Sequence, residues 1–312
     1  MQFKLHSDII VYIIIIIIFE SFISEVFDMW LFFAFGSAFF AGITSVLAKI
    51  GVKNTDSDVA TAIRTCVVVV FSWLMVFVVG SQNTICDIDF NTWLFLILSG
   101  ISTGASWLCY YKALKMGDIN KVVVIDKSST IISMLFAILF LGEHFTFVTI
   151  LCIAAIAFGT FLMVYKKSQQ NTKNKSWVLW AFLSAVFAAL TSVLGKVGVQ
   201  NIDSNLGTAI RTIVVLLISF LIVFMKKKQN LITAVSKKEF LFLCLSGVAT
   251  GASWLCYYKA LKDGLVSVVV PIDKLSILVT VGFSYFVFKE KLSKKSLLGL
   301  VLIVVGTIGV IF

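Results

Sequence analysis

Charged residues are scarce in this chain, and proline is almost absent. Only 13% of the 312 residues are Asp, Glu, Lys or Arg, there is one proline, and 60% are hydrophobic. A soluble domain of this length has too little interior to hide so much apolar surface. The few charges are also bunched, which leaves apolar runs of about 20 residues, the length that crosses a bilayer. The composition therefore excludes a soluble globular protein and predicts an all-α polytopic membrane protein.

Residues that commonly hold metals or carry out catalysis are also few. The two histidines, His6 and His144, lie far apart and show no metal-ligand spacing. All the cysteines except Cys86 fall inside apolar runs, so a disulfide framework is not expected. The sequence contains no Walker motif and no soluble catalytic domain. We therefore expect no enzyme activity, no cofactor and no metal site.

One stretch of the chain occurs twice. The thirteen residues TGASWLCYYKALK occupy positions 103–115 and again 250–262, an offset of 147 residues. Shorter matches on both sides of this stretch repeat at the same offset. One unit is therefore written twice, over residues 29–165 and 177–312, with a polar linker at 166–176.

Each unit predicts five membrane spans. In the first unit we expect them at about 30–50, 59–79, 90–114, 122–141 and 147–165. In the second unit we expect them at about 177–197, 206–225, 240–261, 268–288 and 297–312. Thr146 and Ser293 precede the fifth span of each unit and are good helix N-caps. Because five is odd, the two five-helix repeats should be inverted in the membrane, as is typical of secondary transporters.

Residues 1–28 precede the first repeat and have no counterpart in the second. The apolar run at 9–19 is too short to cross a membrane alone, and polar residues follow it. The segment can be an eleventh span, an interfacial helix or an uncleaved signal anchor. Alternatively, translation starts at Met29, where the repeat begins.

Lysines are concentrated in the loops at one end of the predicted bundle. Sixteen of the eighteen basic residues outside the spans lie there, and positive loops stay cytoplasmic. This places the linker in the cytoplasm and both Trp30 and Phe312 outside. The net charge of +10 is explained in this way, so we expect no nucleic-acid partner.

Short motifs mark the helix ends of the first repeat. They are Ser45-Val46-Leu47-Ala48-Lys49, Arg64, Tyr111-Lys112-Ala113-Leu114, Phe140-Leu141-Gly142-Glu143 and Gly159-Thr160. The second repeat keeps most of them, including Glu290, but has Lys289 where the pattern has glycine. Over residues 30–312 these motifs resemble the drug/metabolite transporter superfamily, in particular its EamA-like family.

The resemblance implies ten helices in two repeats, a transport function and both termini in the cytoplasm. The lysine distribution instead places the C-terminus outside, so the orientation of the chain in the membrane stays open. The chain also resembles five-helix relatives that act as pairs, as if two such chains had been fused.

Ionisable residues recur in pairs inside the predicted spans. The candidates for solute binding or gating are Arg64, Arg211, Asp126, Asp273, Lys127, Lys274, Lys49 and Lys196. Charges at such depth are costly unless they pair or face water, so a functional role is the first hypothesis. Structural ion pairs, or long side chains that reach the interface, are the alternative. We expect Arg64–Asp126 and Arg211–Asp273 interactions to form in turn as two gates.

Hydroxyl and aromatic side chains accompany these charges. The further candidates are Ser106, Ser253, Tyr110, Tyr257, Trp107 and Trp254. On a continuous helix Asp126, Ser129, Thr130 and Ser133 share one face, which suits a wet cavity better than lipid. The hydroxyls can instead bond neighbouring helices, and the aromatics can form an interfacial belt. The Gly-x-x-x-Gly pairs at 100–104 and 247–251 indicate close helix packing.

The pattern predicts a secondary transporter that works by alternating access. The expected solute is a small polar or amphipathic metabolite, amino-acid-like or anionic, with export as one direction. A flippase for a lipid-linked carrier is the alternative, and a membrane-embedded enzyme is less favoured. Proton coupling and passive carriage both stay open. The expected setting is the plasma (inner) membrane of a prokaryote, as a monomer or homodimer in the lipid bilayer.

Overall fold

The computed structural model describes residues 29–52, 54–116, 119–144, 146–164, 176–288 and 293–311. These residues form helices and no strand. The predicted N-terminal segment 1–28 and the linker up to residue 175 lie outside the described residues, as do Lys289, Glu290 and Phe312.

The first repeat forms six α-helices and a short 3₁₀ helix. They are α2 (Met29–Gly51), α3 (Ser57–Val79), η1 (Ser81–Asp87), α4 (Phe90–Met116), α5 (Ile119–Lys127), α6 (Ser129–Leu141) and α7 (Phe147–Val164). The second repeat matches it with α8 (Ser176–Val199), α9 (Ser204–Met225), η2 (Gln229–Leu231), α10 (Lys237–Asp263), α11 (Val266–Lys274), α12 (Ser276–Phe288) and α13 (Lys294–Ile311).

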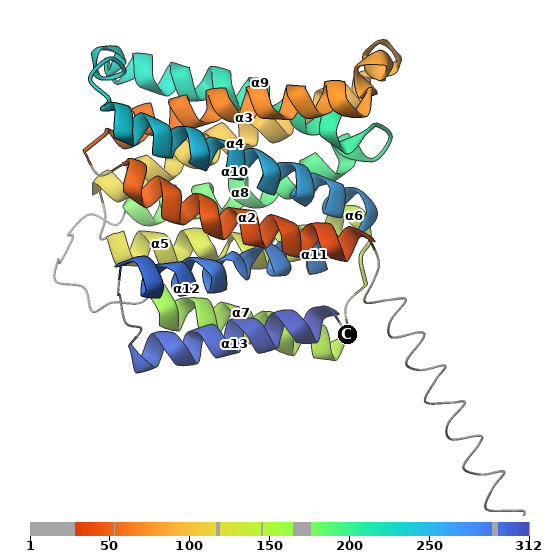
Figure 1. The fold of residues 1–312 in the computed structure, drawn as a ribbon. Helices are drawn as coiled ribbons and strands as arrows, with labels where there is room; N and C mark the ends of the chain where they lie inside the picture. Colours follow the sequence, from red (N-terminus) through yellow and green to blue (C-terminus); the bar gives the residue numbers. More distant parts are fainter. Residues whose placement is uncertain are drawn as a thin grey trace, which may run out of the picture.

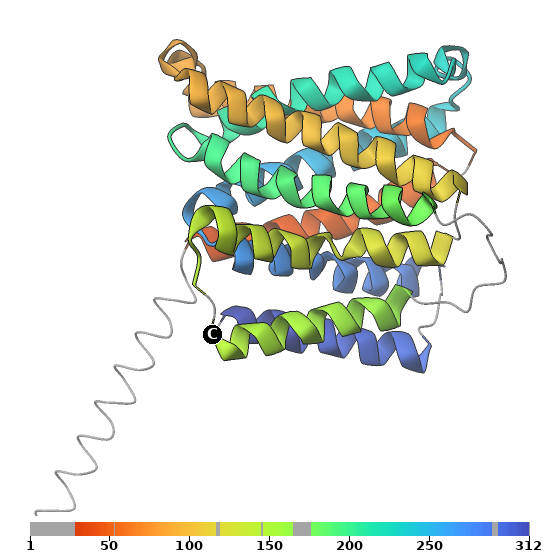
Figure 2. The same cartoon turned by 180° about the vertical axis from the view of Figure 1, so that it is seen from behind.

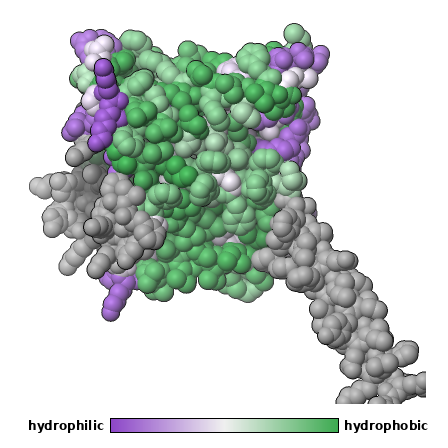
Figure 3. Space-filling view, viewed as in Figure 1, coloured by the Kyte–Doolittle hydropathy of each residue, from purple (hydrophilic) through white to green (hydrophobic). Residues whose placement is uncertain are grey.

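Long apolar helices dominate this set. Among the described residues, eight segments are long and apolar enough to cross a membrane, and Phe147–Met163 is a shorter apolar helix. The outer surface is hydrophobic over its middle, and hydrophilic residues gather toward the two ends (Figure 3). The chain is therefore an integral, multi-pass membrane protein.

Helix caps recur at equivalent positions in the two repeats. The Asp56 side chain accepts hydrogen bonds from backbone N–H groups in the first turn of α3, and Asp203 does the same for α9. Thr146 and Ser293 accept from the backbone N–H groups of Thr149 and Ser296, at 3.2 and 3.1 Å. The predicted N-caps of the last helix in each repeat are thus confirmed.

The fourth span of each repeat is broken, where the sequence predicts one continuous helix. The break falls after Lys127 in the first repeat and after Lys274 in the second. At both points a 3₁₀-type hydrogen bond to the residue three positions back replaces the α-helical bond to the residue four positions back. The N–H group of Ser128 donates to the carbonyl oxygen of Ile125, and that of Leu275 donates to Ile272. Pro271, which lacks an N–H donor, lies just before the second break only, so proline is not the shared cause.

The two repeats interlock. The first helix of each repeat packs along the third helix of the other, α2 on α10 and α8 on α4 (Figure 1). The second helices, α3 and α9, pair with each other, and so do the last helices, α7 and α13, at the opposite edge (Figure 2). We call the end of the bundle that holds Ile311 the C-terminal end, and the end where α7 stops and α8 starts the linker end (Figure 1).

Glycines make the closest helix approaches. A Cβ atom on Gly100 would lie 2.7 Å from Val214 on α9, and one on Gly247 would lie 2.6 Å from Val67 on α3. The predicted packing role of the Gly-x-x-x-Gly pairs is therefore confirmed. The tightest backbone approach joins α7 to α13, where a Cβ on Gly159 would lie 2.6 Å from the carbonyl oxygen of Gly299.

We expect Gly159→Ala to destabilise the bundle by about 1–3 kcal/mol, because α7 would have to move away from a rigid backbone. The measurement is thermal unfolding of the purified protein in detergent. Gly282→Ala is the matched control, since a Cβ there meets nothing within 4 Å and alanine favours the helix. Equal unfolding temperatures for the two variants would contradict the packing role.

Salt bridges join the start of α3 to the end of α9 at the linker end of the bundle. Lys226 bonds the buried Asp58 at 2.9 Å, and Lys228 bonds Asp56 at 2.6 Å and also reaches Asp58. Burial raises the pKa of Asp56, but hydrogen bonds from Lys228 and from backbone N–H groups outweigh it and leave the pKa lowered. At the C-terminal end Val79 and Ser81 stand at the positions equivalent to the two lysines, so the ends differ.

Candidate solute-binding site

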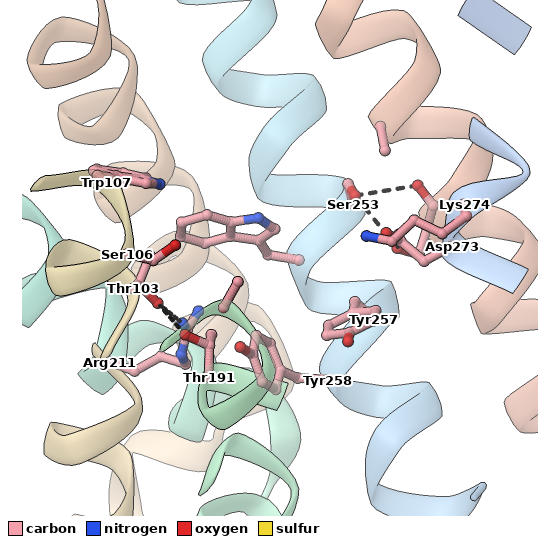
Figure 4. Close-up of a pocket in the computed structure, with 14 residues that line it drawn as sticks. Thr103, Ser106, Trp107, Thr191, Arg211, Ser253, Tyr257, Tyr258, Asp273 and Lys274 are labelled. Carbon is pink, nitrogen blue, oxygen red and sulfur yellow. Dashed lines mark hydrogen bonds between the residues drawn. The ribbon is translucent and has the colours of Figure 1, made fainter. Parts of the chain in front are cut away.

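A central cavity of about 330 Å³ lies between the two repeats. Helices α2 and α4 of the first repeat line it together with α8, α9, α10 and α11 of the second (Figure 4). Its walls carry hydroxyls, aromatic rings, two basic side chains and one carboxylate. A concave site with convergent polar groups and aromatic rings is a candidate small-molecule site.

Arg211 is the most deeply buried charge in this cavity, with 1% of its surface exposed. It donates hydrogen bonds from Nη2 to Thr103 at 2.8 Å and from Nε to Ser99 at 3.3 Å. Its guanidinium also lies over the ring of Tyr258, 4.4 Å from the ring centre. An arginine carries five N–H donors, so donors remain for a solute that enters the cavity.

Tyrosine and tryptophan rings line the cavity beside the hydroxyls, from α4 and α10. Trp254 lies 5.1 Å from the guanidinium of Arg211, measured to the ring centre. The Tyr257 hydroxyl is 2.8 Å from Ser192 on α8. Trp107 lines the cavity from α4 of the other repeat (Figure 4). The rings offer flat apolar surfaces on which part of a solute can stack.

Each intramembrane aspartate is held by a serine of the other repeat. Ser37 donates to Asp273 at 2.7 Å and also contacts Ser253. At the equivalent position Ser184 donates to Asp126 at 2.7 Å and contacts Ser106. The same Ser–Ser–Asp chain thus occurs twice across the interface between repeats. Of the two aspartates, Asp273 lines the central cavity and Asp126 does not.

The helix breaks position these aspartates. Both α5 and α11 have nine residues, so Asp126 and Asp273 lie inside the bundle rather than at its surface. In the second repeat the equivalent hydroxyl face is consequently divided. Asp273 lines the central cavity, whereas Ser276 and Thr280 line a second cavity behind it. The prediction of one continuous polar stripe was wrong because it assumed an unbroken helix.

Glu143, part of the motif at the end of α6, fixes the start of α11. Its carboxylate accepts hydrogen bonds from the N–H groups of Val266 at 2.8 Å and Ser267 at 3.0 Å. Gly142 before it adopts a positive φ of 68° that favours glycine. A carboxylate at a helix N-terminus also complements the helix dipole, so this motif holds the half-helix that carries Asp273.

The C-terminal end of the bundle is the more tightly closed end. There α10 contacts α8 and α9, and α11 contacts α6, whereas the equivalent pairs at the linker end make far fewer contacts among the described residues. The Nζ atom of Lys196 donates to the carbonyl oxygens of Leu261, at 2.9 Å, and Gly264, while the equivalent Lys49 is exposed. Arg211 is buried, and the equivalent Arg64 is half-buried.

Eight of the predicted site residues line the central cavity. They are Arg211, Asp273, Lys274, Ser106, Ser253, Tyr257, Trp107 and Trp254. The other six lie elsewhere: Arg64 on α3, Asp126 against Ser184, Lys127 in the second cavity, Lys49 and Lys196 near opposite ends, and Tyr110 in a cluster around Ala113. Among the described residues, Arg211 and Asp273 form no salt bridge with each other, so the predicted Arg211–Asp273 gate is not formed in this structure.

Ser37 and Ser184 were missed by sequence reasoning. A serine in a helix rich in small apolar residues gives no signal of its own. The internal repeat does give such a signal, because Ser37-Ala38 and Ser184-Ala185 lie 147 residues apart. Thr191, which lines the cavity beside Thr103, is matched by Thr44 in the same way.

Two helix repeats packed around a membrane-embedded polar cavity are typical of membrane transporters. The model of the EamA-like transporter family matches the chain twice, over residues 28–165 and 175–312. The chain therefore belongs to the EamA-like transporter family, as the motifs predicted.

Curated relatives of this chain have the length of one repeat. An uncharacterized transporter of Sinorhizobium sp is 45% identical over 134 residues, which cover 95% of the relative and 43% of this chain. An uncharacterized protein of Methanocaldococcus jannaschii is 30% identical over 131 residues, covering 93% of the relative and 42% of this chain. A crystal structure with 16% sequence identity has the same fold, with a TM-score of 0.76 over 90% of this chain and 96% of its own.

Proposed function

We propose that this protein is a secondary transporter for a small amino-acid-like solute, which it carries by alternating access through the central cavity. The observation that supports this most is the combination of charges in the cavity. Arg211 and Lys274 suit a carboxylate, and Asp273 suits an ammonium group. The aromatic rings of Trp107 and Trp254 would face the remaining part of the solute. A volume of about 330 Å³ favours such a solute over a lipid-linked carrier.

Inverted repeats allow a transporter to open its cavity to one side of the membrane and then to the other. A structure closed at the C-terminal end and less tightly packed at the linker end is one of two related arrangements that the duplicated sequence can adopt. In the other arrangement Arg64 would take the buried place that Arg211 has here, and Asp126 would line the cavity in place of Asp273. Binding of a solute would shift the population between the two states.

Lysines gather at the linker end of the bundle. If that end faces the cytoplasm, the less tightly packed end of this structure is the cytoplasmic one, and a solute for export would enter there. One chain supplies every residue of the cavity, which supports a functional monomer where half-length relatives would need two copies.

The test is a search for stabilising solutes followed by transport. The purified chain is heated in detergent with each member of a panel of amino acids, monocarboxylates and amines. We expect at least one amino acid to raise the unfolding temperature saturably, and its labelled form to enter proteoliposomes. A panel in which only amines or only monocarboxylates stabilise the protein would contradict the proposal.

A further inference from the structure

A second cavity of about 230 Å³ lies behind the central one. Helices α2, α5, α6, α7, α11, α12 and α13 line it, so it lies between the broken helices and the α7–α13 pair. Lys274 lines both cavities and forms part of the wall between them. The transport proposal does not use this space.

Hydrogen-bond donors face this cavity without protein acceptors. Among the described residues, the Lys127 ammonium makes no hydrogen bond or salt bridge, and the hydroxyls of Thr130, Thr160 and Ser276 donate to none. Thr130 is 96% buried, with 4% of its surface exposed. The other two hydroxyls in the lining, Ser45 and Thr280, donate to backbone carbonyls.

No negatively charged side chain among the described residues lines this cavity. Its lining contains two lysines and no carboxylate. The neighbouring Asp126 and Asp273 are turned toward Ser184 and Ser37 instead. Both lysines end half-helices, and α6 and α12 begin two residues after them, so the positive ends of those helix dipoles lie nearby.

An unpaired ammonium group inside a membrane protein is costly unless water or a counter-charge reaches it. Lys274 repels Lys127, while Asp126 and Asp273 attract it from outside the lining of this cavity. The Lys127 side chain is exposed, so a small anion that enters the cavity can reach its ammonium group. Free hydroxyl donors complete the shell that a small anion needs. We propose that the second cavity binds a small inorganic anion of the halide class, held by Lys127, Thr130 and Ser276.

Chloride is the probe for this site. The full-length protein is unfolded thermally in detergent at constant ionic strength, with chloride replacing bulky morpholinoethanesulfonate. We expect chloride to raise the unfolding temperature saturably, by about 2–5 °C at ten times its Kd. In Lys127→Gln the shift should vanish, because the ammonium group that holds the anion is gone.

Two further variants sharpen the test. Thr130→Val removes one donor to a charged ligand and should weaken chloride binding about tenfold. Lys238→Gln, which removes an exposed lysine from the start of α10, should bind chloride as the parent does. A shift that does not saturate, or one that persists equally in Lys127→Gln, would overturn the proposal.

Bromide provides a second readout that needs no variant. In crystals grown with bromide, its anomalous scattering should place the ion beside Lys127 and Thr130. Anomalous density only at the protein surface would also overturn the proposal. Neither measurement involves transport, so failure of the anion site and failure of the transport proposal are distinguishable.

Discussion

Arg211→Gln is expected to lower solute affinity about 10- to 100-fold. The substitution removes a charge-assisted hydrogen bond to the solute carboxylate, worth about 1.5–3 kcal/mol. It also leaves Thr103 and Ser99 without their guanidinium partner. The measurement is the solute concentration that gives half-maximal thermal stabilisation, followed by the transport rate in proteoliposomes. Arg211→Lys should recover only part of the loss, because an ammonium group lacks the planar fork.

Arg64→Gln is the matched control for Arg211, since it removes the equivalent arginine from a helix position that does not line the cavity. Its solute affinity should stay within about twofold of the parent, a difference of less than about 0.5 kcal/mol. Its transport rate should still fall, because the opposite state needs Arg64. If the two arginine variants lose affinity equally, Arg211 is not a specific ligand of the solute.

Asp273→Asn is expected to separate zwitterionic from anionic solutes. Asparagine keeps the shape and can still accept a hydrogen bond from Ser37, but the cavity loses its one carboxylate. An amino acid then loses the partner of its ammonium group, and its affinity should fall about 10- to 100-fold. A monocarboxylate without an amino group should bind as well as before or better, since two positive charges now face it alone.

Asp126→Asn serves as the control for this second experiment. Asp126 has the same serine partner arrangement but does not line the central cavity. Amino-acid affinity should therefore be unchanged, whereas turnover in proteoliposomes should fall. An unchanged amino-acid affinity in Asp273→Asn would remove the carboxylate from solute recognition and leave an anionic solute as the better interpretation.

The duplicated sequence predicts the helices and their pairing well, because apolar length and repetition depend on local composition. Gly100 and Gly247 were correctly assigned to packing for this reason. The helix breaks were not predicted, since Val124 and Pro271 stand at equivalent positions and only one of them disfavours a helix. The charged residues at the breaks could thus be identified from the sequence. The cavity that each of them lines could not be predicted.

Asymmetry is the other feature that sequence could not supply. Arg64 and Arg211 have the same neighbours in sequence, yet one is half-buried and the other buried. Two units with similar sequences can adopt two conformations, and the conformation that each one adopts depends on its packing against the other. Ser37 was missed for a related reason, because its role appears only when α2 lies against the other repeat.

Counterflow in proteoliposomes tests the central claim most directly. Vesicles that contain the protein are loaded with the unlabelled amino acid that stabilised it best, and the labelled form is added outside. A carrier with one cavity that alternates between the two ends must exchange solutes, so labelled solute should accumulate transiently and then decline. Uptake that neither saturates nor responds to the internal solute would contradict alternating access through the central cavity.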